Sequence, residues 1–148
     1  MLEQDLNVLL ASTFGMALKA QRYHWNVMGM DFYQLHEFYE EIYEDLYEHV
    51  DIIAEAIRSL GKFPAGSFAE YAELSQVAEE DTTITDAAAQ LQELVRANDV
   101  VLRVIKIAMT AADDEDAEDI EDLLVNRMRQ HKKHGWMLNS FLNRQQRQ

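Results

Sequence analysis

Apolar residues recur along the chain at the three- and four-residue spacing of amphipathic helices. Four long segments carry this pattern, and they cover residues 2–27, 31–60, 82–112 and 113–142. Asn26 and Gly29 are typical helix-ending residues after the first segment, and Gly61 stops the second. The pattern therefore predicts four long helices separated by short breaks, except for one long connection between the second and the third.

Helix-start signals support these limits. Asp31 followed by Gln34 resembles a capping box at the start of the second helix. Within the long connection, the stretch SFAEYAEL at residues 67–74 predicts a short helix that begins at Ser67. The third helix has three candidate caps, Thr82, Thr83 and Thr85. The acidic run at residues 113–119 is expected to open the fourth helix, where negative charge suits the positive end of the helix dipole.

The helix pattern predicts an all-α fold. Four long helices with one long connection describe a ferritin-like four-helix bundle with a short extra helix in that connection. One proline and five glycines in 148 residues leave few places for hairpin turns. We expect residues 1–148 to form a single domain, because this length is typical of one apolar core.

Composition limits the classes of function. The chain has no cysteine, which rules out disulfides and thiolate metal sites and is compatible with a reducing cytoplasm. Its first residues are acidic, unlike a secretory signal, and no apolar run reaches the length of a membrane span. We therefore expect a soluble cytoplasmic protein that has no membrane partner.

The formal net charge of −14 favours cations over phosphate backbones as partners. Such a charge also serves solubility alone, so the charge by itself does not identify a function. The positions of individual ligand-type residues have to decide.

One face of the second predicted helix carries four metal-ligand residue types. His36, Glu40, Asp51 and Glu55 fall within about 100° of one another around the helix axis. Glu40 and Asp51 are nevertheless about 16 Å apart along the axis, whereas ligand atoms lie about 2 Å from a bound metal. One chain therefore cannot close a single site with both pairs.

A second copy of the chain could close the site. The sequence midpoint between His36 and Glu55 is also the midpoint between Glu40 and Asp51. An antiparallel, two-fold-related copy of this helix would thus place His36 opposite Glu55 and Glu40 opposite Asp51 in one register. Because a two-fold interface is isologous, each pair of chains would hold two identical sites.

His24 lies near the end of the first helix, twelve residues before His36. The short turn through Gly29 can fold it back toward the start of the second helix, where it would add a third ligand from the first chain. Two imidazoles and three carboxylates form a mixed nitrogen and oxygen set, which suits iron, manganese, zinc or cobalt.

Residues 23–55, YHWNVMGMDFYQLHEFYEEIYEDLYEHVDIIAE, resemble the signature of the Dps proteins, the miniferritins first described as DNA-binding proteins from starved cells. The resemblance extends to the short helix in the long connection, to the acidic stretch before the last helix and to an aromatic residue near the end, Trp136. It implies an inter-subunit ferroxidase site, and the matching positions here are His24, His36, Glu40, Asp51 and Glu55.

The resemblance also implies a function. A Dps protein is an enzyme that binds two Fe(II) ions, oxidises them preferably with hydrogen peroxide rather than oxygen, and stores ferric mineral inside a shell of twelve subunits. Zinc or manganese could replace iron at such a site. Glu40 stands where many Dps proteins have aspartate, so its longer side chain can shift the second metal position.

The acidic run has two interpretations. In Dps proteins, acidic residues at the start of the last helix line pores through which iron enters, and Asp116 and Asp119 are our candidates for that role. The same run also fits an ordinary solvated helix start.

Other titratable and aromatic residues are assigned structural roles. His49 lies off the ligand face, and His131 and His134 have no acidic partner at helical spacing. Tyr43 and Tyr47 are expected to pack where two copies of the second helix meet. For Trp25 and Trp136 two roles stay open: packing in the core, or accepting stray oxidising equivalents as the resemblance suggests.

Three other functions compete with iron oxidation. DNA compaction is disfavoured, because no lysine precedes Lys19 and the C-terminus offers only Arg144 and Arg147. An ordinary ferritin site inside each bundle would need Glu-x-x-His motifs, and the sequence has none. A zinc-binding helical assembly without redox activity stays open, because the ligand types suit both metals.

Overall fold

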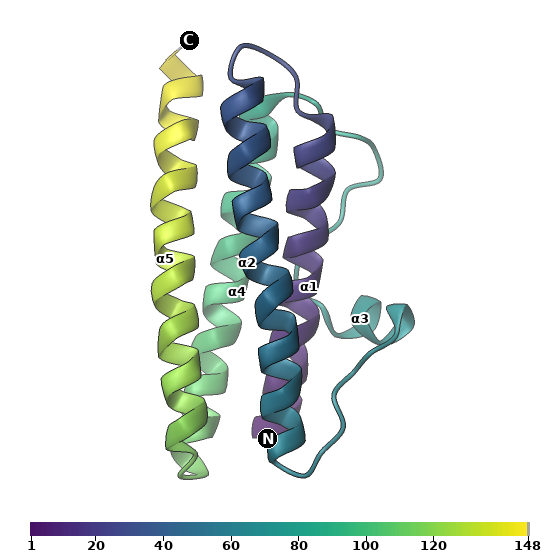
Figure 1. Cartoon of the computed structure of the whole chain (residues 1–148), viewed down its shortest axis with the longest axis vertical. Coiled ribbons are helices and arrows are strands. Elements are labelled where there is room, and N and C mark those ends of the chain that lie inside the picture. Colours follow the sequence, from purple (N-terminus) through teal and green to yellow (C-terminus); the bar gives the residue numbers. More distant parts are fainter. Residues whose placement is uncertain (148) are drawn as a thin grey trace.

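Four long helices pack side by side, and a fifth, short helix lies outside them (Figure 1). The computed structural model describes the backbone of residues 1–147 and the side chains of residues 1–143, so the side chains of Arg144 and Arg147 lie outside the described residues. The predicted fold class is confirmed. The helices are α1 (Leu2–Asn26), α2 (Phe32–Ser59), α3 (Phe68–Leu74), α4 (Ala87–Asp114) and α5 (Glu118–Arg147).

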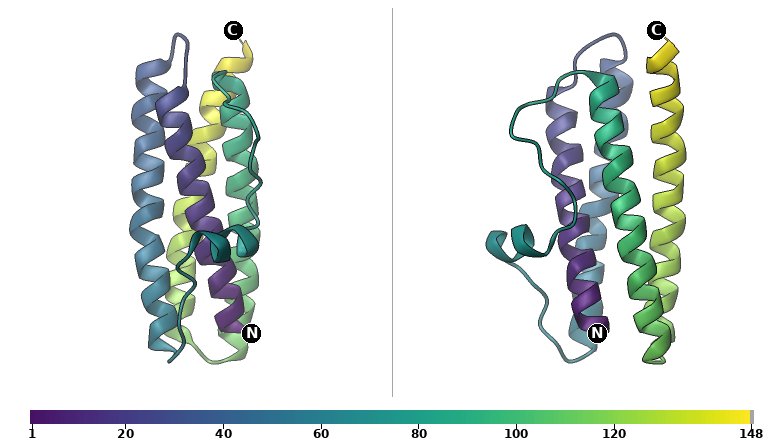
Figure 2. Two further views of the ribbon diagram at one scale, coloured as in Figure 1. Left: turned by 90° about the vertical axis from the view of Figure 1, so that its right-hand side faces the viewer. Right: turned by 180° about the vertical axis from the view of Figure 1, so that it is seen from behind.

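The topology pairs neighbouring helices into two antiparallel hairpins, α1 with α2 and α4 with α5. A long crossover, residues 60–86, joins the hairpins and runs along the outside of the bundle, carrying α3 with it (Figure 2). Short turns at residues 27–31 and 115–117 close the hairpins at opposite ends of the bundle.

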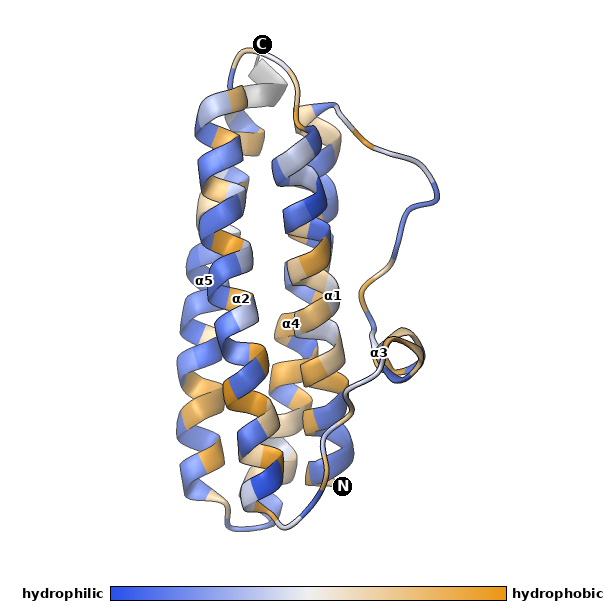
Figure 3. Ribbon diagram, turned by 45° about the vertical axis from the view of Figure 1, so that its right-hand side comes forward, coloured by the Kyte–Doolittle hydropathy of each residue, from blue (hydrophilic) through white to orange (hydrophobic). Residues whose placement is uncertain are grey.

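The core lies where the apolar stripes of the four long helices meet (Figure 3). Fully burying one leucine or isoleucine side chain contributes about 1.5–3 kcal/mol, so these stripes rather than helix propensity hold the bundle together. Core residues that are fully buried include Leu6, Leu10, Ile42, Leu46, Leu94, Val101, Leu124 and Leu138.

Several helix starts differ from the sequence prediction. The Asp31 side chain makes no capping hydrogen bond to α2, so the predicted capping box does not form. Asp86, rather than one of the three threonines, caps α4, and its carboxylate accepts a hydrogen bond from the Ala89 backbone at 3.0 Å. Ser67 caps α3 as predicted and accepts from the Glu70 backbone at 3.2 Å.

The acidic run does not open the last helix as a whole. Asp113 and Asp114 are the final residues of α4, and α5 begins only at Glu118. Asp116 lies in the turn between them with a φ of 54°, a left-handed conformation that aspartate tolerates better than most residues. The prediction failed because acidic residues at the end of one helix and at the start of the next follow each other in the sequence with only Ala117 between them.

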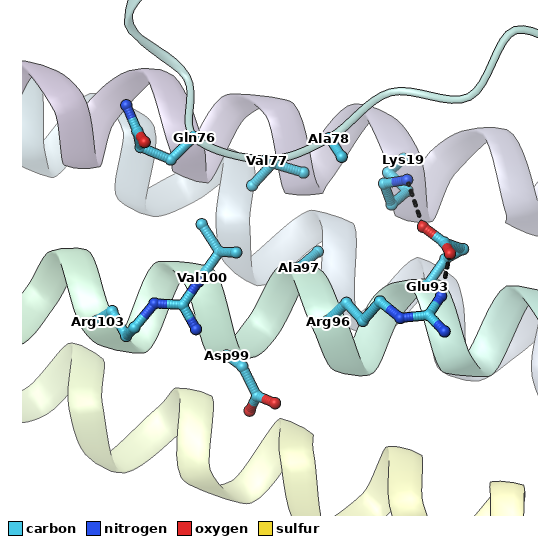
Figure 4. Close-up of a pocket in the computed structure, with 10 residues that line it drawn as sticks. All are labelled: Lys19, Gln76, Val77, Ala78, Glu93, Arg96, Ala97, Asp99, Val100 and Arg103. Atoms are coloured by element: carbon cyan, nitrogen blue, oxygen red, sulfur yellow. Dashed lines mark hydrogen bonds and ion pairs between the residues drawn. The ribbon is translucent and has the colours of Figure 1, made fainter.

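Polar contacts hold the crossover against α1. Lys19 Nζ lies 2.6 Å from Glu80 Oε2 and 3.7 Å from a Glu93 oxygen on α4, and the Tyr23 hydroxyl donates to Glu80. The crossover and α4 enclose an open groove of about 340 Å³ beside this cluster (Figure 4). Among its charged wall residues, Glu93 pairs with both Arg96 and Lys19. The groove contains none of the predicted metal ligands.

Membrane crossing requires a helix that is both long and strongly apolar. Over the part of the chain that the structure describes, none of the helices meets both conditions.

Candidate metal centre

The turn between α1 and α2 brings His24 and His36 together, as predicted. Gly29 adopts a φ of 119°, a conformation that few other residues tolerate, and this allows the tight reversal of the chain. The two imidazole rings stack with their centroids 3.7 Å apart and their planes at 13°. His24 is buried, at 7% exposure, and His36 is half-buried.

Reciprocal hydrogen bonds fix both rings. Nδ1 of His24 lies 2.6 Å from the backbone carbonyl oxygen of His36, and Nδ1 of His36 lies 2.7 Å from that of His24. A carbonyl oxygen only accepts, so each Nδ1 carries the proton. In its neutral form each ring therefore has its lone pair on Nε2. Histidines that bind a metal through one ring nitrogen commonly donate a hydrogen bond from the other, and this bond fixes the orientation of the ring.

Glu40 and Tyr43 lie on the same side of α2. The Tyr43 hydroxyl donates to Glu40 Oε1 at 3.4 Å, and the Tyr43 ring makes an edge contact with His24 at 5.3 Å. Partial burial and the nearby Glu40 charge raise the pKa of Tyr43, so its hydroxyl stays protonated and remains a donor. Glu40 is half-buried, and its place beside the two imidazoles in the half-site remains a prediction.

Asp51 and Glu55 lie farther along α2, and both side chains are exposed. They do not join the histidine half-site of their own chain. Among the described residues of one chain, no three histidine, aspartate or glutamate side chains come close enough to hold a metal ion. This agrees with the separation of about 16 Å that helix geometry gives for Glu40 and Asp51.

Large apolar side chains near the histidine half-site are exposed to solvent. Trp25 is 60% exposed, and next to it in the turn the exposed apolar residues are Met28, Met30, Phe32 and Tyr33. The interpretation of Trp25 and Trp136 as core residues is wrong, because Trp136 on α5 is also 69% exposed. Helical spacing alone could not reveal this, since Trp25 follows directly after buried His24 at the end of its helix.

The two pore candidates are both exposed. Asp116 lies in the turn before α5 and Asp119 in its first turn. Slight desolvation and the charges of Asp113, Glu118 and Asp116 raise the pKa of neighbouring Glu121, which reflects crowding of like charges at this end of the bundle. A channel role for these residues remains a prediction.

A buried polar cluster that the sequence did not reveal joins α2 to α5. Arg127, 2% exposed, donates from Nη1 and Nη2 to the two carboxylate oxygens of Asp45 at 3.1 and 2.9 Å. His134 Nε2 lies 3.0 Å from Asp45 Oδ2. His131 contacts both Arg127 and Asn98 of α4. His134 therefore has an acidic partner, but the partner comes from another helix, where spacing within α5 could not indicate it.

Gly135 lies at a tight contact between α5 and Asn98 of α4. A Cβ atom at Gly135 would lie 3.0 Å from Asn98 Nδ2. Asn98 Nδ2 donates to the backbone carbonyl of His131 at 2.8 Å, so its Oδ1 is the acceptor for His131 Nδ1.

The cluster shifts the pKa values of two of its members. Burial alone would raise the pKa of Asp45, but hydrogen bonds from His134 and Arg127 and the Arg127 charge hold it well below its ordinary value of 3.8. Burial, followed by the charge of Arg127, lowers the pKa of His131 well below 6.5. Both groups therefore bind protons more readily in the unfolded chain than in the folded one.

Acid should destabilise the fold in two stages. As pH falls, protonation of unfolded His131 begins to favour unfolding below about 6.5, and protonation of unfolded Asp45 adds to this below about 4. Urea unfolding at a fixed chain concentration, measured from pH 8 to pH 3, should give a free energy of unfolding that is constant above pH 7 and falls below it. His131→Gln should flatten the slope between pH 6.5 and 5. An unchanged slope in that variant would mean that other groups cause the first stage.

The chain resembles known proteins over almost its whole length. The family model of the ferritin-like domain matches residues 3–147. DNA protection during starvation protein 2 of Bacillus anthracis is 34% identical over 138 residues, which are 93% of this chain and 94% of that protein.

Solved structures give the same result. A Dps protein from Vibrio cholerae O1, described as a member of a broad superfamily of ferritin-like diiron-carboxylate proteins, superimposes with a TM-score of 0.91 at 33% identity and covers 95% of this chain and 88% of its own. A Dps protein from Bacillus brevis superimposes with a TM-score of 0.91 at 32% identity, covering 95% of this chain and 94% of its own.

Proposed function

Because this chain belongs to the Dps family of ferritin-like proteins, we propose that it is a ferroxidase that binds Fe(II) at sites shared between two chains and stores the oxidised iron. Hydrogen peroxide is the preferred oxidant in this proposal, and oxygen is the slower one. Iron is the substrate, and removing Fe(II) together with peroxide protects the cell from oxidative damage. We place this activity in the cytoplasm, with which the absence of cysteine is compatible.

The observation that carries the proposal is the division of ligands along α2. At one end of α2 lie oriented His36 and half-buried Glu40, with His24 beside them at the end of α1, and at the other end lie exposed Asp51 and Glu55. An antiparallel second copy of α2 brings the carboxylate end of each chain to the histidine end of the other. The exposed apolar residues in and beside the turn, within residues 25–33, support this, because a second copy would cover them.

Each residue then has a defined task. His24 and His36 supply Nε2 lone pairs from rings that are already oriented, which reduces the reorganisation needed on binding. Glu40, with Asp51 and Glu55 of the second copy, supplies carboxylate oxygens that compensate the metal charge. Mixed imidazole and carboxylate ligands with open positions suit iron and leave room for the oxidant. Carboxylates stabilise the ferric product more than the ferrous substrate, because its charge is higher.

We expect twelve chains in a closed shell. A dodecamer of the 17.2 kDa chain has a mass of about 206 kDa, which native mass spectrometry or light scattering at neutral pH measures directly. A stable monomer or dimer with full iron oxidation activity would contradict the shell.

Aerobic addition of Fe(II) tests the chemistry itself. Ferric absorption should rise faster with peroxide than with oxygen, and the product should remain with the protein during gel filtration. A zinc-binding assembly without redox activity would bind Zn(II) but leave the rate of Fe(II) oxidation equal to that of buffer. Zinc or manganese bound at the shared site should instead inhibit oxidation by competing with iron.

We expect no direct binding of duplex DNA near neutral pH. A chain with a formal charge of −14 repels the phosphate backbone. Gel retardation at moderate salt, with EDTA present, should therefore show free DNA only. Salt-sensitive retardation under these conditions would contradict the prediction, whereas retardation that requires added divalent metal would reflect bridging of two anions.

A further inference from the structure

The last part of the crossover, residues 80–86, lies against the end of α1 that carries His24, and we call this segment the strap (Figure 2). The Tyr23 hydroxyl donates to one oxygen of the Glu80 carboxylate, and Lys19 Nζ lies 2.6 Å from the other. Tyr23 is fully buried, and the side chains of Lys19 and Glu80 are 5% and 15% exposed. Water therefore competes little with these contacts, and a charged acceptor makes them strong.

Two more strap contacts lie before and after His24 in the chain. Arg22 donates from Nη2 to the Thr83 hydroxyl at 3.2 Å. In the turn, the backbone N–H of Met28 donates to the carbonyl oxygen of Thr85 at 3.1 Å. The strap is therefore bonded to the chain on both sides of the histidine.

The strap is itself held against α4. The side-chain amide of fully buried Gln90 donates to the carbonyl oxygen of Ile84 at 2.7 Å. Asp86, the last residue of the strap, caps α4. The strap thus connects the end of α1 to a helix of the other hairpin.

The end of α1 needs such support. The last turn of a helix lacks part of its hydrogen bonds and frays when nothing holds it. His24 lies in the last turn of α1, and its ring must stay where Nδ1 reaches the His36 carbonyl oxygen at 2.6 Å. Because Tyr23 precedes His24 in the same turn, movement of the Tyr23 backbone would turn the imidazole away from this position.

We propose that the strap positions His24 for metal binding, and that Tyr23 and Glu80 are its positioning residues. Both act on the site only through the backbone of α1. The metal-binding part of this inference rests on the proposed function, whereas the anchoring of the helix end does not. The orientation of His24 then depends on how the two hairpins pack, because the strap is fixed on α4.

Hydrogen exchange of the metal-free protein tests the anchoring. Tyr23→Phe removes the hydroxyl that reaches the strap and leaves both the ring and the ion pair of Lys19 with Glu80. The amide hydrogens of residues 22–28 should then exchange about 10-fold faster, whereas those in the middle of α5 should keep their rate. Tyr71→Phe is the matched control, because it removes a half-buried tyrosine hydroxyl from α3, outside the strap. It should leave the exchange of residues 22–28 unchanged.

Co(II) binding tests the effect on the site. The part of this binding that His36→Ala abolishes reports the shared site. Tyr23→Phe should weaken that part roughly 10-fold, as loss of a group that orients a ligand does. Tyr71→Phe should bind Co(II) as the unmodified chain does. A loss of stability alone would instead speed exchange in every helix and leave the Co(II) affinity of the folded protein unchanged.

Each outcome decides. Exchange of residues 22–28 that is unchanged, or that rises equally in all helices, overturns the proposal. A local rise with unchanged Co(II) affinity also overturns it, because His24 would then be positioned without the strap. If Tyr23→Phe does not fold, Arg22→Met, which removes the bond to Thr83, decides by the same two measurements. If the unmodified chain binds no Co(II) through His36, the proposed function fails together with the metal-binding part, and hydrogen exchange alone decides the anchoring.

Discussion

Replacing His36 or Asp51 by alanine should each abolish rapid Fe(II) oxidation, with a loss of roughly 100-fold or more in the initial rate. His36 presents Nε2 from a ring held by the His24 carbonyl, and Asp51 is exposed at the other end of α2. In the shared-site arrangement each substitution removes one ligand from every site. Stopped-flow absorbance after mixing with Fe(II) and peroxide measures the effect.

Co-assembly of the two variants tests where the ligands come from. In a pair of one His36→Ala chain and one Asp51→Ala chain, one site contains both defects and the other contains neither. Random assembly of equal amounts makes half of the pairs mixed, so about a quarter of all sites should be intact. Unfolding and refolding the mixture should therefore restore about a quarter of the wild-type rate.

A matched mixture controls for nonspecific recovery. His24→Ala and His36→Ala damage the same half-site, so no combination of these chains yields an intact site and no activity should return. Mixing the His36→Ala and Asp51→Ala particles after assembly should also have no effect. Absence of recovery in refolded pairs that mass spectrometry verifies as mixed would rule out the inter-subunit site.

Asp45→Ala should lower the free energy of unfolding by about 3–5 kcal/mol near neutral pH. The substitution removes the counter-ion of Arg127, which is 2% exposed, and also the acceptor of the His134 hydrogen bond. An unpaired charge then remains in the core. Urea unfolding at one chain concentration measures the loss, since assembly itself contributes to apparent stability.

The neighbouring substitution Glu44→Ala provides the control. Glu44 is exposed on the same helix, and its removal should change stability by less than about 0.5 kcal/mol. Asp45→Asn should lie between the two variants, because the amide keeps one acceptor but carries no charge. A loss below about 1 kcal/mol for Asp45→Ala would mean that the ion pair does not hold α5 against α2.

The fold was predictable because it depends on periodicity. Stripes of leucine, isoleucine and valine define four helices and their buried faces, and Gly29 and Gly61 mark real turns with positive φ. Helix limits were less predictable where several candidates stood in a row. The sequence analysis considered only threonines as caps of α4, whereas the cap is Asp86. The acidic run also concealed the end of α4 at Asp114.

The candidate site was predictable only in part. Spacing placed His36, Glu40, Asp51 and Glu55 on one face and showed that one chain cannot close the site. It could not show the reciprocal hydrogen bonds between the His24 and His36 backbones and rings, because these depend on the exact path of the turn. The pairing of these half-sites between chains remains a prediction.

The partners within the interior cluster were not predictable from the sequence. Asp45 and Arg127 are 82 positions apart, and each alone looks like an ordinary charged helix residue. Only tertiary packing brings them together, with Gly135 at a tight contact between α5 and Asn98 of α4. A charged residue inside an apolar stripe is the one signal in the sequence, as with Arg127 between Leu124 and Met128.

The hairpin arrangement of the bundle also predicts the order in which the chain folds. Contacts within α1 and α2, and within α4 and α5, join residues close in sequence, so each hairpin closes a small loop and can form quickly. Docking of one hairpin on the other requires closure of the crossover at residues 60–86, which is slower. The Asp45–Arg127 pair forms in this docking step. Removing the pair should therefore raise the unfolding rate more than it lowers the folding rate.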